Sequence, residues 1–161
     1  MTQTGIERRH VVVGVALLVI LAVGLSARLH RLGDESIDLE EYACVRHLDA
    51  PNLVAFVTLQ KSLYPYGAPL APALEYLWAQ AVGTGIFRVR LLFVLVGMLI
   101  IPLSYLFAHS FMGGGPIGRR AGLIAAACVA LSPVQVFHAQ EARMYAFLSF
   151  FVLLSAYALL Q

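Results

Sequence analysis

The chain has 161 residues, of which 60% are hydrophobic and 12% are charged, and its formal net charge at pH 7 is +2. Because globular domains are about half apolar and about a quarter charged, this composition argues against a water-soluble fold. The basic residues are scattered along the chain and form no stripe, so nucleic acid is not an expected partner.

The first long apolar run covers residues 11–28 and follows Arg8 and Arg9. A helix needs about 20 largely apolar residues to cross the hydrocarbon core of a bilayer, and this run is close to that length. A secretory signal peptide has a similar pattern, but the length of the run favours a retained anchor. The preceding basic pair places the N-terminus in the cytoplasm.

The segment 29–88 is far longer than the usual connection of about 4–6 residues, so it must contain structure of its own. We expect an outer loop of short helices that lie along the membrane surface. The third of them is alternatively another spanning helix, but it is short and has Glu75 near its middle. Proline and glycine positions predict these helices at 38–48, at 52–59 and from Pro69 or Pro72 to Gly83.

Three further apolar runs follow, at residues 89–112, 121–137 and 144–161. We therefore expect an all-α polytopic membrane protein, with about four transmembrane helices in a single membrane domain and both ends in the cytoplasm. The basic pair at 119–120, between the second and third spans, agrees with this orientation. Two arginines near the outer end of the first span, Arg28 and Arg31, argue against it.

Two short segments flank the second span. Arg88 and Arg90 open it, and we expect their side chains to extend toward lipid headgroups. A flexible glycine-rich turn is expected at 113–118, and it lacks the pattern of a phosphate-binding loop. Neither segment predicts a catalytic site.

Five of the nine acidic residues fall between Asp34 and Glu41, directly after the first span. Carboxylates beside apolar walls at a membrane surface can have raised pKa values and act as general bases, or they can bind a divalent cation. Alternatively, they cap and solvate the start of a helix, where acids also interact favourably with the helix dipole. The candidate catalytic residues are Asp38, Glu40 and Glu41.

The second polar segment, at 132–145, forms the turn between the third and fourth spans, on the same side of the membrane as the acids. It offers a carboxylate, a fixed cation and a phenol, and an arginine at membrane level is a natural partner for a lipid phosphate. Alternatively, its charges pair with other charges and stabilise the turn. The candidate substrate-binding residues are His138, Gln140, Glu141, Arg143 and Tyr145.

No metal site and no cofactor are predicted. The outer histidines, His30, His47 and His138, lack the i, i+4 spacing of a helical metal pair. A divalent metal at the acidic cluster has no further support in the sequence. Because Cys44 falls in the outer loop and Cys128 within a span, we expect no disulfide between them.

Several motifs follow one another along the chain in a recognisable order. The acidic pair at 40–41 follows the first span, a Pro-Leu-aromatic helix runs from Pro69 to Gly83, and Arg90 and Leu91 open the second span. The most specific motif is His-Ala-Gln-Glu-Ala-Arg-Met-Tyr at 138–145. This arrangement resembles the N-terminal part of the polytopic type C glycosyltransferases, the superfamily that contains the protein O-mannosyltransferases and the aminoarabinose transferases.

The resemblance implies a membrane glycosyltransferase, or the N-terminal region of one, that uses a lipid-linked sugar donor such as a polyprenyl-phosphate sugar. It implies transfer to an acceptor on the extracytoplasmic face, in which an acid of the first outer loop deprotonates the acceptor hydroxyl and the lipid phosphate is displaced with inversion. Glu40 stands at the position of the family's aspartate, Glu41 follows it, and Asp38 is the alternative base. We expect the chain in a bacterial inner (cytoplasmic) membrane, in contact with membrane lipids.

Members of this family have more spans, so the chain is expected to be an N-terminal fragment or a truncated form of a larger fold. The alternative hypothesis is a truncated, non-catalytic homologue that serves as a structural transmembrane subunit of a larger membrane complex. Other membrane subunits would then be its partners. Sugar transfer on the one hand, and co-purification with subunits on the other, distinguish the two hypotheses.

Overall fold

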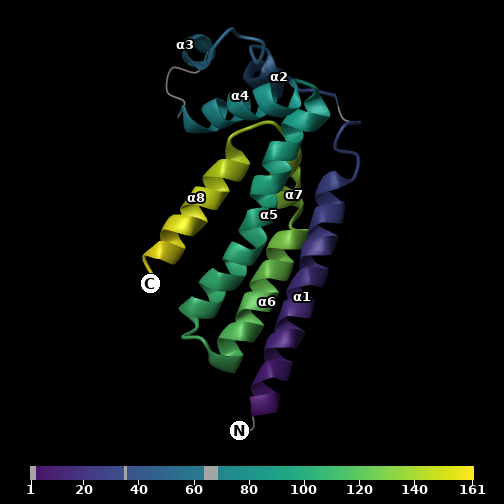
Figure 1. Cartoon of the computed structure of the whole chain (residues 1–161), viewed down its shortest axis with the longest axis vertical. Helices are drawn as coiled ribbons and strands as arrows, with labels where there is room; N and C mark the ends of the chain where they lie inside the picture. The colour runs from purple at the N-terminus through teal and green to yellow at the C-terminus, as the bar shows by residue number, and fades with distance from the viewer. Residues whose placement is uncertain (1–2, 35, 64–68) are drawn as a thin grey trace.

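The structure of the chain is a computed structural model that describes residues 3–34, 36–63 and 69–161, with side chains from residue 11 onward. The regular structure in these residues is entirely helical. Four helices run along the long axis of the molecule (Figure 1). They are α1 (Gln3–Leu29), α5 (Ile86–Phe111), α6 (Gly115–Leu131) and α8 (Tyr145–Ala158).

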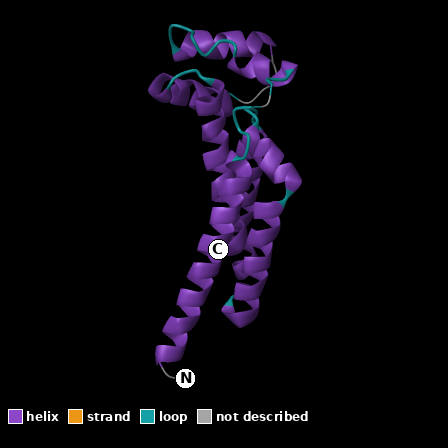
Figure 2. Cartoon of the chain, turned by 90° about the vertical axis from the view of Figure 1, so that its right-hand side faces the viewer, coloured by secondary structure: helices purple, strands orange, loops and turns teal. Residues whose placement is uncertain are grey.

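Three shorter helices form a layer across one end of this bundle, at the end opposite the N-terminus (Figures 1 and 2). These are α2 (Leu39–Val45), α3 (Leu53–Leu63) and α4 (Leu70–Val82), and together they are called the crosswise layer below. The remaining helix, α7 (Pro133–Gln140), connects α6 to this end of the bundle. The helical fold class expected from the sequence is therefore correct.

Two helices in the described part of the chain are long and apolar enough to cross a membrane, Val11–Leu29 within α1 and Ile86–Phe111. The pair α6 and α7 makes a third candidate if the two are counted as one span with a 54° bend. At 14 residues, α8 is about 21 Å long, which is less than the hydrocarbon thickness of about 30 Å. The described helices thus include two or three candidate spans, which is consistent with an integral membrane protein, and the four spans expected from the sequence are not confirmed.

The central helix is α5, which packs against α1, α4, α6, α7 and α8. Its contact with α6 is close because Gly122 has no side chain, and a Cβ there would lie 2.6 Å from the Tyr105 ring. The connection between these two helices, residues 112–114, is shorter than the glycine-rich turn predicted at 113–118. Helix α6 already begins at Gly115, because Pro116 suits the first turn of a helix.

The third span expected at 121–137 is interrupted at Ser132. This residue leaves the helical conformation with ψ 119°, and its Oγ accepts a hydrogen bond from the Gln135 amide, so it caps the start of α7. Pro133 has no N–H and cannot bond to the carbonyl of Val129, which ends α6. The apolar run in the sequence therefore folds as two helices, and α7 belongs to the polar end of the bundle.

The bounds of the three helices in the crosswise layer differ little from those predicted. Asp38 is the N-cap of α2, because its Oδ1 accepts from the Glu41 amide at 2.6 Å. Helix α3 continues to Leu63, beyond the expected end at 59, and α4 ends before Gly83, whose φ of 100° suits glycine. Side-chain bonds to backbone carbonyls, such as Gln80 to Leu48 at 2.9 Å, tie the three helices together.

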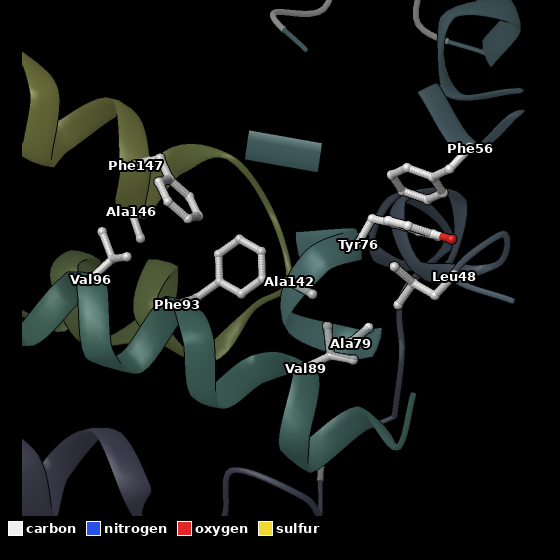
Figure 3. Close-up of a cluster of buried hydrophobic side chains, with 10 residues drawn as sticks. All are labelled: Leu48, Phe56, Tyr76, Ala79, Val89, Phe93, Val96, Ala142, Ala146 and Phe147. Carbon is white, nitrogen blue, oxygen red and sulfur yellow. The ribbon is translucent and has the colours of Figure 1, made fainter. Parts of the chain in front are cut away.

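One apolar cluster joins the crosswise layer to the bundle (Figure 3). In the layer, the Phe56 and Tyr76 rings stack with centroids 5.1 Å apart. In the bundle, Phe93 of α5 meets Phe147 of α8 edge to face at 5.6 Å. Because these groups are buried in one continuous cluster, the layer is fixed relative to α5 and α8, and so are the polar residues between them.

Candidate functional site

The two polar segments singled out in the sequence meet at the junction of the bundle and the crosswise layer. Residues 38–41 lie at the start of α2, and residues 138–145 run from the end of α7 to the start of α8. More than 90 residues apart in the chain, they are joined by an ion pair between Glu40 and Arg143 and by a hydrogen bond from the Ala142 amide to Glu41. They form the candidate site.

Glu41 and Arg90 form a buried ion pair at the base of this site. The Arg90 Nε and Nη2 donate to the two carboxylate oxygens of Glu41 at 2.8 and 2.6 Å, and the two residues are 3% and 1% exposed. Arg90 Nη1 donates to the Leu32 carbonyl at 2.9 Å, and the Ala142 amide donates to Glu41 Oε1 at 2.8 Å. The pair therefore connects α2, α5, the turn that follows α1 and the segment before α8. The expectation that Arg90 extends to headgroups is wrong, because a buried carboxylate faces it.

A second, more accessible ion pair is formed by the neighbouring residue Glu40 and by Arg143. The Glu40 side chain is 61% exposed and that of Arg143 is 20% exposed. The same Arg143 Nη2 donates to the Tyr145 hydroxyl at 3.1 Å, and the guanidinium carbon lies 4.7 Å from the centre of the Tyr145 ring. Arg143 is thus oriented by its neighbours while part of it faces outward, beside the exposed carboxylate of Asp38 on the same turn as Glu40.

His138 and Glu141 lie close to Tyr145 and Arg143, and Glu141 Oε2 is 3.9 Å from Arg143 Nη1. The His138 ring is 4.6 Å from that of Tyr145, and its Nδ1 lies 3.9 Å from Glu141 Oε2. Both atoms are buried and have no hydrogen-bond partner among the described residues. Burial raises the pKa of Glu141, and the positive charge of Arg143 offsets part of this rise.

Gln140, the remaining candidate for substrate binding, contacts the end of α1. Its Nε2 lies 3.4, 3.1 and 2.9 Å from the carbonyl oxygens of Ala27, Arg28 and His30. These carbonyls belong to the last turn of α1, where helix acceptors lack partners within the helix. In this structure, Gln140 caps a helix.

In the sequence, Glu75 served only as an argument against an additional spanning helix in the outer loop, but the structure brings it close to the site. Its side chain is 3% exposed, and Oε1 is buried with no hydrogen-bond partner among the described residues. Burial raises the pKa of Glu75 well above its usual value, and the charge of Glu41 adds to the effect. The pKa of the Cys44 thiol also rises, to about 12, through burial and then through the charge of Glu75. A lone acid in an apolar helix was the available signal.

The second residue missed is Arg28, which the sequence placed at the membrane interface. It is fully buried, and it donates to carbonyls of α6. No group of three or more His, Cys, Asp or Glu side chains suited to a metal ion occurs in the described part of the chain.

No protein-family model, curated protein or solved structure matches the chain. Function must therefore be inferred from the residues of the site and from their geometry.

Proposed function

We propose that the chain is a membrane glycosyltransferase, or the N-terminal region of one, which transfers a sugar from a polyprenyl-phosphate donor to an acceptor hydroxyl on the extracytoplasmic face. The observation that carries this proposal is the contact of Arg143 with Glu40, an oriented cation beside exposed carboxylates. The resemblance of residues 138–145 to the glycosyltransferase motif, and of the acidic segment before it, supports the same function.

Arg143 is suited to hold the phosphate of the donor. Its planar guanidinium can bind two oxygens of a phosphate at once, and Tyr145 fixes its direction. Its present partner is easily replaced, because ion pairs as exposed as this one contribute about 0–1 kcal/mol. A lipid phosphate at the membrane surface would compete with Glu40 for Arg143 and leave the Glu40 carboxylate available.

The released carboxylate of Glu40, or that of Asp38, then acts as the base. It accepts the proton of the acceptor hydroxyl, whose oxygen forms a bond to the anomeric carbon of the sugar. The bond between that carbon and the phosphate oxygen breaks, and the polyprenyl phosphate leaves with the electron pair, which inverts the anomeric centre. Glu41 has a different part in this proposal, because Arg90 and the Ala142 amide engage both of its oxygens. It is a positioning residue that fixes the acidic turn against Arg143.

We also propose that the crosswise layer faces the outside of a bacterial cytoplasmic membrane and that the N-terminus is cytoplasmic. The basic pair at 119–120, at the opposite end of the bundle, supports this orientation. A fourth span at 144–161 is part of the proposal. Its support is a hydrogen bond of 3.2 Å from Gln161 to Ser110 near the end of α5, so the segment after α8 reaches that depth of the bundle.

Sugar transfer in membranes of cells that express the gene tests the proposal. A panel of polyprenyl-phosphate donors with radiolabelled sugars would be supplied, and the release of polyprenyl phosphate measured. We expect Glu40→Gln or Asp38→Asn to reduce transfer by about 10²-fold or more, the usual effect of a general base. Asp34→Asn is the matched control, because Asp34 is an exposed acid of the same segment and its ion-pair partner among the described residues is the exposed Arg31.

The outcome decides between the two hypotheses. Loss of transfer in the Glu40 or Asp38 variant but not in the control supports the enzyme. The proposal is refuted if deleting the gene leaves transfer from every donor unchanged and if, in wild-type cells, the chain co-purifies with other membrane subunits. The chain would then be a structural subunit.

A further inference from the structure

Arg28 lies in the last turn of α1 and is completely buried. Its Nη1 donates to the carbonyl oxygens of Gly24 and Ala130, both at 3.1 Å, and its Nη2 donates to the carbonyl of Val129 at 3.2 Å. Two of these three acceptors belong to the last turn of α6, more than 100 residues away in the chain. The arginine therefore joins the end of one helix to the end of another.

The acceptors on α6 are available because the helix is interrupted there. In a continuous helix, the carbonyl of Val129 would accept from residue 133 and that of Ala130 from residue 134. Pro133 has no N–H, and Ser132 leaves the helical conformation, so both bonds are lost. The guanidinium of Arg28 replaces both donors, and a buried carbonyl without a donor would destabilise the fold.

A reciprocal contact holds the other end of α7. The Gln140 side chain, at the last residue of α7, bonds to the open carbonyls of α1, among them that of Arg28 itself at 3.1 Å. Gly97 of α5 makes room for this arrangement, because a Cβ there would lie 2.7 Å from the Ala139 Cβ and 3.4 Å from Arg28 Nε. The bend between α6 and α7 is thus fixed at both ends by α1.

We propose that Arg28 is a positioning residue: it holds the bend between α6 and α7 and thereby sets Glu141, Arg143 and Tyr145 against the start of α2. The inference rests on the proposed function only where it concerns phosphate binding. Its structural part, the replacement of the donors lost at Pro133, can be tested without any ligand.

The test combines Arg28→Met with Pro133→Ala and uses Arg31→Met as the control. Arg31 carries the same charge three residues further on, but its side chain is 64% exposed. Each variant would be purified in lipid nanodiscs. Its apparent unfolding temperature would be measured by circular dichroism, and its affinity for polyprenyl phosphate, without sugar, by a titration.

We expect Arg28→Met to lower the unfolding temperature by about 5 °C or more, and Arg31→Met to change it little. In the Pro133→Ala background the alanine N–H can bond to the Val129 carbonyl, so the loss caused by Arg28→Met should be clearly smaller. The double variant should still bind polyprenyl phosphate at least about tenfold more weakly than the wild type, because a straightened helix moves Arg143 away from α2.

Two results would overturn the inference. One is that the losses from Arg28→Met and Pro133→Ala simply add, since the arginine would then not serve the carbonyls freed by the proline. The other is that Pro133→Ala restores stability and phosphate binding together, which would make Arg28 a stabilising residue alone. If the unfolding temperatures behave as expected but the wild type does not bind polyprenyl phosphate, the proposed function fails while the assignment of Arg28 to the bend is supported.

Discussion

Replacing Glu41 by glutamine removes one charge from the buried pair at the base of the site and leaves the shape of the side chain nearly unchanged. Arg90, which is 3% exposed, would then face an uncharged amide in place of the carboxylate that it now contacts at 2.6 Å. Removing one partner of a buried ion pair costs about 3–5 kcal/mol. The Ala142 amide, which now donates to Glu41 at 2.8 Å, would also lose a charged acceptor. We therefore expect Glu41→Gln to lower the free energy of unfolding by about 3–5 kcal/mol.

The measurement is unfolding in mixed micelles with increasing SDS, followed by circular dichroism. Glu40→Gln is the matched control, since it breaks an exposed ion pair on the adjacent residue and should cost about 0–1 kcal/mol. The double variant Glu41→Met with Arg90→Met should lose less than the sum of its single variants, because each single variant already removes the contact between the two residues. Equal losses for Glu41→Gln and Glu40→Gln, or additive losses in the double variant, would refute the reasoning.

Two further predictions concern Glu75 and Cys44, which lie near this pair. The pKa of Glu75 is raised in the folded chain by burial and by the charge of Glu41. Above the ordinary pKa of a glutamate, the unfolded chain releases this proton while the folded chain keeps it. The free energy of unfolding therefore falls as pH rises from the ordinary pKa toward the folded pKa. Glu75→Gln should remove this pH dependence, so the free energy of unfolding of the variant should rise relative to that of the wild type between pH 5 and pH 8 in the same SDS titration. The same pH dependence in both proteins would contradict this. Burial raises the pKa of Cys44 from 9.0 to about 12, which reduces its thiolate about 10³-fold. In a Cys128→Ser background, iodoacetamide at pH 8 should modify Cys44 much more slowly in the folded chain than after unfolding, whereas equal rates in the two states would contradict the raised pKa.

The crosswise layer could be predicted from the sequence because its helices have local boundary signals. Pro69 and Gly83 flank the third of them, and Asp38 caps the first. The bend at Ser132 was not predicted, because the apolar run continues across it. What ends α6 there is the missing N–H of Pro133, and what makes the break tolerable is Arg28, which lies more than 100 residues away.

The candidate site could be predicted as a set of residues but not as an arrangement. Glu40 and Glu41 are equivalent in the sequence, yet successive residues point about 100° apart on a helix. Only the position of Arg90 on a different helix decides that Glu41 is buried and Glu40 exposed. Pairs of this kind depend on how helices pack, which no local pattern encodes.

Binding of polyprenyl phosphate to the chain in lipid nanodiscs tests the central claim most directly. The account predicts that Arg143→Gln weakens this binding by about tenfold or more, since a charge-assisted hydrogen bond contributes about 1.5–3 kcal/mol. Arg46→Gln, which removes an exposed arginine at the end of α2 whose side chain bonds to His47, should leave the affinity unchanged. Equal affinities for the two variants, or equally tight binding of the unphosphorylated polyprenol, would contradict the claim that Arg143 holds a lipid phosphate.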